Sequence, residues 1–254
     1  MNRLEKLFKE KKKNILNIYF TAGHPTLNSL GEIILSLEQA GVDLIEIGMP
    51  YSDPLADGTT IQNSSAMALE NGMHLDLLFE QVDVVRKETD IPIMLMGYFN
   101  QLLQYGVDKF FKHCIDSGID GLIIPDIPMD YYETKLKQKT KDRDLRMTFL
   151  VTPETSNERI QQADKLSDAF LYVVSKSSIT GNVTNMDNGQ ETYFEKLNKL
   201  DLKSPRLIGF GIHDKASFEL AAEKANGAII GSAFIRSLDK DGINGIPGFI
   251  SQFR

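Results

Sequence analysis

The chain has 254 residues, of which 42% are hydrophobic and 25% charged, and its formal net charge is −7. This composition is typical of a folded globular protein and excludes a disordered or fibrous chain, while the acidic balance argues against general binding to nucleic acid or to a membrane surface. The single cysteine, Cys114, leaves no disulfide framework, and no apolar run approaches the roughly 18 residues of a membrane span. The charged N-terminus lacks the apolar core of a signal peptide, so we expect a cytoplasmic protein.

Short apolar runs rich in β-branched residues alternate along the chain with stretches of helical periodicity. This alternation predicts parallel strands joined by crossover helices. After a short amphipathic helix near the N-terminus, eight strands are expected, one around Glu46 and the others at 15–20, 93–96, 122–124, 147–151, 170–174, 207–208 and 228–230. Helices are expected over 30–40, 61–70, 75–82, 110–118, 132–139, 152–166, 192–200 and 218–225.

Eight strand–helix units in a chain of this length favour a closed (β/α)8 barrel, the TIM-barrel architecture, with an extra N-terminal helix. Length alone fits one barrel or two smaller domains, but no composition shift marks a linker, so a single catalytic domain over residues 1–254 is expected. An open doubly wound sheet is the alternative. The helix-to-strand junctions at 40–43, 117–120 and 225–228 resemble one another, which indicates weak repetition of one unit.

Glu46 places a carboxyl group inside the apolar run of the second strand, beside Leu44, Ile45 and Ile47. An ionised carboxylate without a partner would be very costly there. Two interpretations fit: Glu46 is a paired polar residue of the core, or its pKa is raised and it moves a proton. Its position just before a turn-rich loop favours the second.

That loop, residues 48–58, carries two further carboxyl groups, Asp53 and Asp57. Its prolines and glycines predict a stiff loop with unusual backbone conformations. Capping of turns and a role in chemistry are both open for the two aspartates.

Other side chains are expected to gather where the strands of a barrel end, because the carboxyl ends converge on one face. Together they predict an apolar pocket for a flat ring, although each by itself fits ordinary barrel core. These residues are Tyr19, Met96, Tyr98, Ile123, Val151, Tyr172 and Phe210.

Glycine turns end the last two strands, where barrel enzymes often bind phosphate with backbone N–H groups. Gly209, Gly211, Gly231 and Ser232 fit this role. The long polar loop 175–189 has a composition that predicts mobility. Within it, Gly181 fits a second contact to the phosphate and Thr180 a contact to the substrate.

Several sequence segments resemble the tryptophan synthase alpha-subunit family over essentially the whole chain. The main one runs from Glu46 to Gly58, followed by Ile61 and Gln62, and the others are 19–25, 125–128, 175–181 and 209–212. The resemblance implies a barrel that cleaves indole-3-glycerol phosphate to indole and glyceraldehyde 3-phosphate by a retro-aldol reaction. The sequence departs from the family pattern at Thr59, Lys176 and Ser178.

The same resemblance implies roles for three residues: Glu46 as the acid/base, Asp57 as the carboxylate that binds the indole N–H, and Tyr172 as a neighbour of Glu46. It implies that this chain carries no cofactor of its own. It also implies a pyridoxal-phosphate beta subunit as partner, in an alpha2-beta2 heterotetramer, contacted through residues 50–58 and 96–104.

Two other classes of protein compete with this interpretation. A metal-dependent sugar-phosphate isomerase or epimerase would need clustered histidine and aspartate ligands, and the four histidines are scattered. A barrel that only senses a phosphorylated metabolite would have no use for a costly buried acid such as Glu46. No nucleophilic triad, metal-binding motif or dinucleotide fingerprint is present, which leaves acid–base chemistry by carboxyl groups.

Overall fold

The computed structural model describes residues 1–54, 57–175, 188–209 and 211–254. Eight parallel strands form a closed barrel in chain order, with β1 also paired to β8. The predicted barrel is confirmed, and the strand bounds lie close to the expected ones. The strands are β1 (Ile15–Thr21), β2 (Leu44–Gly48), β3 (Ile93–Met96), β4 (Gly121–Ile123), β5 (Arg146–Val151), β6 (Leu171–Val174), β7 (Arg206–Gly209) and β8 (Gly227–Ile230).

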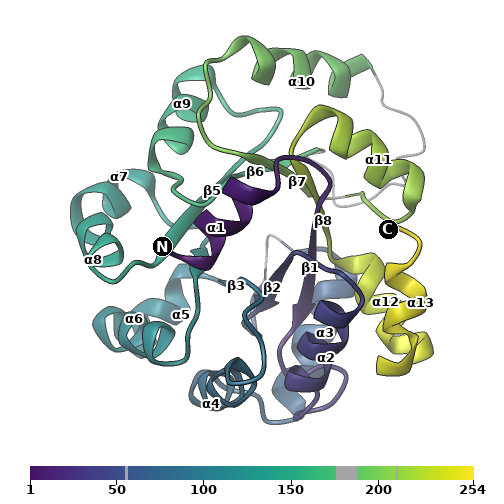
Figure 1. Ribbon diagram of the computed structural model, residues 1–254. Coiled ribbons are helices and arrows are strands. Elements are labelled where there is room, and N and C mark those ends of the chain that lie inside the picture. The colour runs from purple at the N-terminus through teal and green to yellow at the C-terminus, as the bar shows by residue number, and fades with distance from the viewer. Residues whose placement is uncertain (55–56, 176–187, 210) are drawn as a thin grey trace.

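Helices follow the strands and form a ring around the barrel (Figure 1). They are α1 (Arg3–Glu10), α2 (Leu30–Gln39), α3 (Thr59–Glu70), α4 (Leu75–Arg86), α5 (Phe99–Tyr105), α6 (Val107–Asp116), α7 (Met129–Tyr131), the π-helix η1 (Tyr132–Leu136), α8 (Lys137–Lys141), α9 (Asn157–Leu166), α10 (Asn188–Lys199), α11 (Lys215–Lys224), α12 (Ser232–Asp241), the 3-10 helix η2 (Ile243–Gly245) and α13 (Ile246–Ile250). Among the residues described, none of these helices is long and apolar enough to cross a membrane.

Most expected helices are present with ends shifted by a few residues, and the larger differences are the following. Helix α5 was not predicted; it starts where the Gln101 side chain accepts a hydrogen bond from the Tyr98 N–H, and Gly106, with φ +89°, separates it from α6. The helix expected from residue 152 begins only at α9, because the Ser156 hydroxyl caps the Arg159 N–H. Helices α12 and α13 were not predicted either.

The strands bury side chains on both faces. One cluster, which includes Ile45, Ile47 and Val151, packs between the sheet and the helices. A second cluster fills the barrel interior with alternate strand residues such as Ile15, Leu44 and Leu207. This arrangement corrects one expectation, because Val151 belongs to the outer cluster and faces away from the barrel interior.

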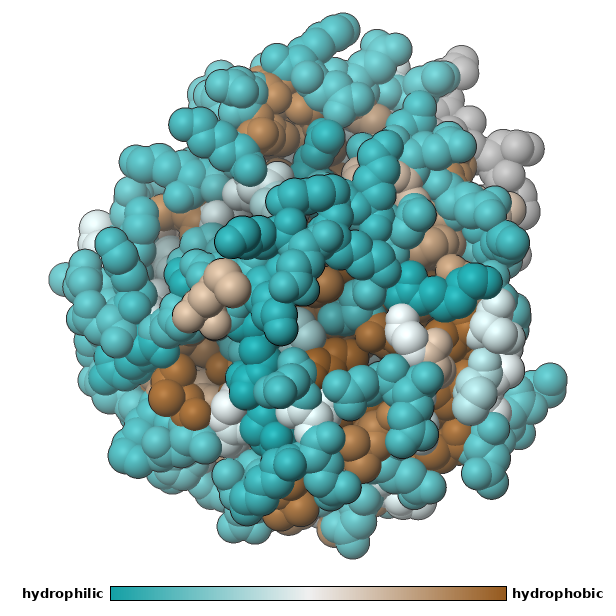
Figure 2. Space-filling view, viewed as in Figure 1, coloured by the Kyte–Doolittle hydropathy of each residue, from teal (hydrophilic) through white to brown (hydrophobic). Residues whose placement is uncertain are grey.

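Helix α1 closes one end of the barrel. Its apolar residues Leu4 and Phe8 are buried in the interior cluster, and the helix lies across the middle of the view in Figure 1. Hydrophilic side chains make up most of this face (Figure 2). The amino ends of the strands are therefore covered, and the opposite end is left to carry the site.

Four clamps join the amino ends of neighbouring strands. In each, a side chain just before an even-numbered strand accepts a hydrogen bond from a backbone N–H at the start of the preceding strand. The residue that carries this side chain also donates its backbone N–H to the carbonyl of that residue of the preceding strand. The four pairs are Asp43 with Leu16, Asp120 with Ile93, Asp168 with Met147 and Asn226 with Arg206. Three of them coincide with the repeated junctions of the sequence, which explains that repetition.

Candidate active site

Glu46 lies in the barrel interior, in the middle of β2 and between the outward-facing Ile45 and Ile47. Its side chain is fully buried. The amide of Asn17, on β1, donates to Glu46 Oε2 at 3.0 Å, while Oε1 has no hydrogen-bond partner among the described residues. Burial raises the pKa of Glu46 to about 8; the Asn17 hydrogen bond opposes this rise and the charge of Asp57 adds to it. Near neutral pH, Glu46 can therefore both hold and release a proton.

Asp57 lies in the loop after β2 and is nearly buried. Its N–H donates to the carbonyl of Pro54, and the Gln62 amide donates to its own carbonyl, so the end of the loop is tied to the start of α3. The Tyr98 hydroxyl donates to Asp57 Oδ2 at 2.9 Å. Burial raises the pKa of Asp57, and the Tyr98 hydrogen bond works against the rise.

Two tyrosines pack against strand glycines beside Glu46. Tyr19 is paired with Glu46 in the β1–β2 register, and a Cβ on Gly48 would lie 2.1 Å from the Tyr19 hydroxyl. A Cβ on Gly209 would lie 2.4 Å from the hydroxyl of Tyr172. Burial and the negative charges of Glu46 and Asp57 hold the pKa of both tyrosines well above the usual range. These glycines thus make room for the rings that surround Glu46.

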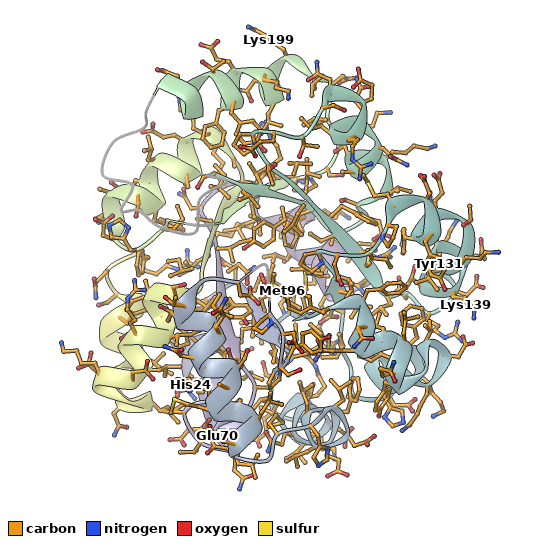
Figure 3. All side chains as sticks on the ribbon, turned by 180° about the vertical axis from the view of Figure 1, so that it is seen from behind. His24, Glu70, Met96, Tyr131, Lys139 and Lys199 are labelled. Carbon is orange, nitrogen blue, oxygen red and sulfur yellow. The ribbon has the colours of Figure 1, made fainter. Side chains whose placement is uncertain are left out.

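A cleft opens above these side chains at the carboxyl end of the barrel. Seen from behind, Met96, one of its lining residues, lies near the middle of the molecule (Figure 3). The lining residues are Tyr19, Met49, Pro54, Asp57, Ser65, Met96, Gly97, Tyr98 and Pro125. Tyr19, Met96, Tyr98 and Asp57 were predicted here, whereas Met49, Pro54, Ser65, Gly97 and Pro125 were not predicted as lining residues. Pro54 and Pro125 lie in the sequence segments that carry the family resemblance, which was a usable signal.

The remaining predicted residues lie inside the barrel, in the turns after β7 and β8, or outside the described residues. Ile123 is fully buried inside the barrel beside Met96, below the cleft lining. Gly231 caps the start of α12 and Ser232 is its first residue, so their backbone N–H groups lie at a helix N-terminus. Gly211 has φ +82° in the turn after β7. Thr180, Gly181 and Phe210 lie outside the described residues.

Asn17 is a further residue of the site that sequence reasoning missed. Leu16 and Ile18 face the helices, so strand alternation turns Asn17 toward the barrel interior. A polar residue at an inward position next to the strand of Glu46 was the available signal. Within the described ranges, no group of three or more histidine, cysteine, aspartate or glutamate side chains is placed to hold a metal ion.

Comparison with known proteins identifies the family. A family model of the tryptophan synthase alpha chain matches residues 5–246. The tryptophan synthase alpha chains of Flavobacterium psychrophilum and Christiangramia forsetii are 52% and 48% identical to this chain, over 99% or more of both sequences in each case.

Solved structures agree with the sequence comparison. Tryptophan synthase subunit alpha from Legionella pneumophila superposes with a TM-score of 0.89 at 29% identity, covering 100% of this chain and 97% of that one. Tryptophan synthase from M. tuberculosis, in its aminoacrylate-bound form, gives 0.87 at 25% identity, over 100% of this chain and 98% of that one. The chain therefore belongs to the tryptophan synthase alpha chain family.

Proposed function

We propose that this enzyme, an indole-3-glycerol-phosphate lyase of tryptophan biosynthesis, works through two carboxyl groups. Glu46 moves the protons and Asp57 binds the indole N–H. The observation that carries the proposal is a glutamate fully buried at the floor of the barrel mouth, with its pKa raised to about 8, next to a second carboxyl group that lines the cleft.

Cleavage of the bond between the indole ring and the glycerol chain needs two proton movements. A proton is delivered to the ring carbon that carries the glycerol chain, and the hydroxyl proton of the adjacent glycerol carbon is removed as the bond breaks. The products are indole and glyceraldehyde 3-phosphate. One glutamate can perform both transfers in turn when its pKa lies near the working pH.

Asp57 has an electrostatic task. Protonation of the ring carbon leaves positive charge on the ring nitrogen, and an ionised carboxylate at that nitrogen stabilises it. The Tyr98 hydroxyl, 2.9 Å from Asp57 Oδ2, supports this role because it favours the ionised form of Asp57 and fixes its direction. Tyr19, Met96 and Tyr98 supply apolar surface for the ring, with Ile123 and Tyr172 packed behind them.

The phosphate group is proposed to bind at the turns after β7 and β8. Gly231 and Ser232 support this because they begin α12, whose first N–H groups attract an anion. Gly211 allows close backbone approach at its positive φ. Gly209 is also proposed to contact the phosphate, in addition to making room for the Tyr172 ring. The proposed contacts of Gly181, Thr180 and Phe210 with the substrate stay predictions from the sequence.

We also propose a partner. Solved structures similar to this chain include whole tryptophan synthase. An alpha2-beta2 assembly with a pyridoxal-phosphate beta subunit, which takes the indole directly, fits this similarity. Residues 50–58 and 96–104 are the proposed contact surface, and Pro54, Asp57, Met96 and Tyr98 within them line the cleft. The chain acts as one catalytic domain in the cytoplasm.

The test is the Glu46→Gln variant, which keeps the shape of the side chain. Indole release from indole-3-glycerol phosphate is expected to fall by about 10²-fold or more, while substrate binding by calorimetry is retained. Glu133→Gln is the matched control, because Glu133 is a surface residue of η1 paired with Lys165. Near-normal cleavage by Glu46→Gln would remove Glu46 from the mechanism.

A further inference from the structure

Asn17 and Glu46 form a hydrogen-bonded polar pair inside the barrel. They lie on adjacent strands, and both side chains are fully buried. Asn17 Nδ2 donates to Glu46 Oε2 at 3.0 Å. The other two oxygens, Asn17 Oδ1 and Glu46 Oε1, have no hydrogen-bond partner within the described part of the chain. Buried polar atoms without partners are costly, so packing alone does not explain an asparagine here.

The strand register shows where this pair holds the carboxyl group. Glu46 is paired with Tyr19 on β1, and Asn17 lies two residues nearer the amino end of the same strand, paired with Leu44. The Glu46 carboxyl is thus held toward the barrel interior. Glu46 is absent from the cleft lining, whereas Tyr19 is part of it. Asn17 of β1 therefore holds the Glu46 carboxyl from the side nearer the amino ends of the strands.

A carboxamide is suited to a partner that changes its protonation state. Its NH2 group donates to a carboxylate, and its carbonyl oxygen accepts from the O–H of a carboxylic acid. A half-turn about the Cβ–Cγ bond exchanges the two ends. The Asn17 side chain can therefore keep one hydrogen bond to Glu46 whether or not Glu46 carries a proton.

We propose that Asn17 is a positioning residue of the lyase, whose amide holds the Glu46 carboxyl in place in both protonation states so that the same group can accept and deliver a proton. This inference rests on the proposed role of Glu46. A side chain without hydrogen-bonding groups at position 17 would leave the carboxylate form without a donor from the part of the chain that the structure describes.

Few ionisable groups act on Glu46. Asp57 from the loop after β2, Tyr19 from β1 and Tyr172 from β6 interact with it electrostatically, and β3 places the apolar Met94 beside it. Among the described residues, Asn17 is the group that favours the charged form, against burial and the charge of Asp57. Loss of the amide therefore raises the pKa of Glu46 further.

The experiment compares Asn17→Leu with Thr148→Val. Thr148, on β5, also faces the barrel interior, is fully buried, and has a hydroxyl without a partner among the described residues, so it controls for loss of a buried polar group. The pH dependence of kcat/KM is measured for both, together with the titration of Glu46 by 13C NMR, its signal assigned by its absence in Glu46→Gln. Asn17→Gln, which keeps an amide, tests for rescue.

In Asn17→Leu, the acidic limb of kcat/KM and the NMR titration of Glu46 are both expected to move up by about one pH unit or more. At pH 7 kcat falls about tenfold and recovers toward higher pH, while KM changes by less than about twofold. Thr148→Val keeps the wild-type profile, and Asn17→Gln lies between wild type and Asn17→Leu.

Wild-type titration and pH profile in a folded Asn17→Leu protein would overturn the proposal, as would equal shifts in Asn17→Leu and Thr148→Val. Failure of the proposed function is distinguishable: a fully active Glu46→Gln would show that Glu46 is not the acid/base, whereas the NMR titration reports the Asn17–Glu46 pair without reference to activity.

Discussion

Glu46 carries a carboxyl group where its charge is poorly tolerated. With its pKa at about 8 in the folded chain, against about 4.3 for an exposed glutamate, the folded protein keeps a proton that the unfolded chain gives up between these two values. The free energy of unfolding should therefore fall as the pH rises from about 4 to 8. The acid needed for catalysis thus destabilises the fold at neutral pH.

Glu46→Gln removes this effect and retains an oxygen that can accept from Asn17. The variant is expected to be more stable than wild type at pH 8, on the order of 1–3 kcal/mol, with the difference vanishing near pH 4. Urea unfolding at several pH values measures it. Glu133→Gln, at the surface, should show no such trend, and a pH-independent difference in Glu46→Gln would mean that the pKa of Glu46 is not raised.

Tyr98 acts on the second carboxyl group. Tyr98→Phe removes the hydroxyl that donates to Asp57, so the pKa of Asp57 should rise further and its ionised fraction fall. We expect kcat to drop about tenfold, since hydrogen bonds to charged groups are the stronger ones, with activity recovering toward higher pH. Tyr105→Phe, which loses a hydroxyl bonded to Asp76 and His113, should leave the steady-state rates unchanged. An unaltered pH profile in Tyr98→Phe would mean that the Tyr98 hydroxyl does not control the ionisation of Asp57.

At the scale of elements, the four clamps fix neighbouring strands at their amino ends, but they are not equivalent. Asp120 also pairs with Arg3 and Arg86, and the Arg86 side chain is itself nearly buried. The Asn226 side chain has no charged partner among the described residues; it accepts from the Arg206 N–H and donates to the carbonyl of Lys12. Loss of Asp120 therefore leaves a buried cation, whereas loss of Asn226 leaves neutral groups.

Asp120→Ala should cost about 3–5 kcal/mol of stability because of the uncompensated Arg86, and Asn226→Ala about 1–2 kcal/mol. Urea unfolding at neutral pH gives both values, with the exposed Asp53→Ala as a control. Equal losses in the two clamp variants would show that the ion pairs of Asp120 contribute nothing.

At the scale of the whole molecule, the cleft lies beside the two segments proposed to meet the beta subunit. The loop with Asp57 is one of them, and Tyr98, its hydrogen-bond partner, lies in the other. A partner that binds the arrangement with Asp57 turned to the indole nitrogen shifts the population toward it and raises the rate.

The measurement is indole release by this chain with and without its cognate beta subunit. We expect an increase of about 5- to 150-fold, the usual range for coupled sites. The mixture of Glu46→Gln with the beta subunit should stay inactive, which shows that release comes from this site. Equal rates with and without partner would mean that the free chain already holds the productive arrangement.

Local pattern was enough for the architecture and part of the site. Short apolar runs rich in β-branched residues and helical stretches of period 3.6 are short-range patterns, so eight strand–helix units could be predicted from the sequence, and with them the barrel. A carboxyl group in an apolar strand is equally local, which is why Glu46 was identified. Tyr19, Met96 and Tyr98 followed, because strand ends meet at one face in any such barrel.

Tertiary structure decided which buried groups meet. Asn17 reaches Glu46 only through the register of β1 with β2, and Arg86, at the end of α4, reaches Asp120 only because β3 and β4 are neighbours in the sheet. Gly48 and Gly209 looked like loop or phosphate glycines, yet their missing side chains admit the rings of Tyr19 and Tyr172. Such contacts join residues far apart in the chain, and their energies depend on register and closure, which composition and periodicity do not encode.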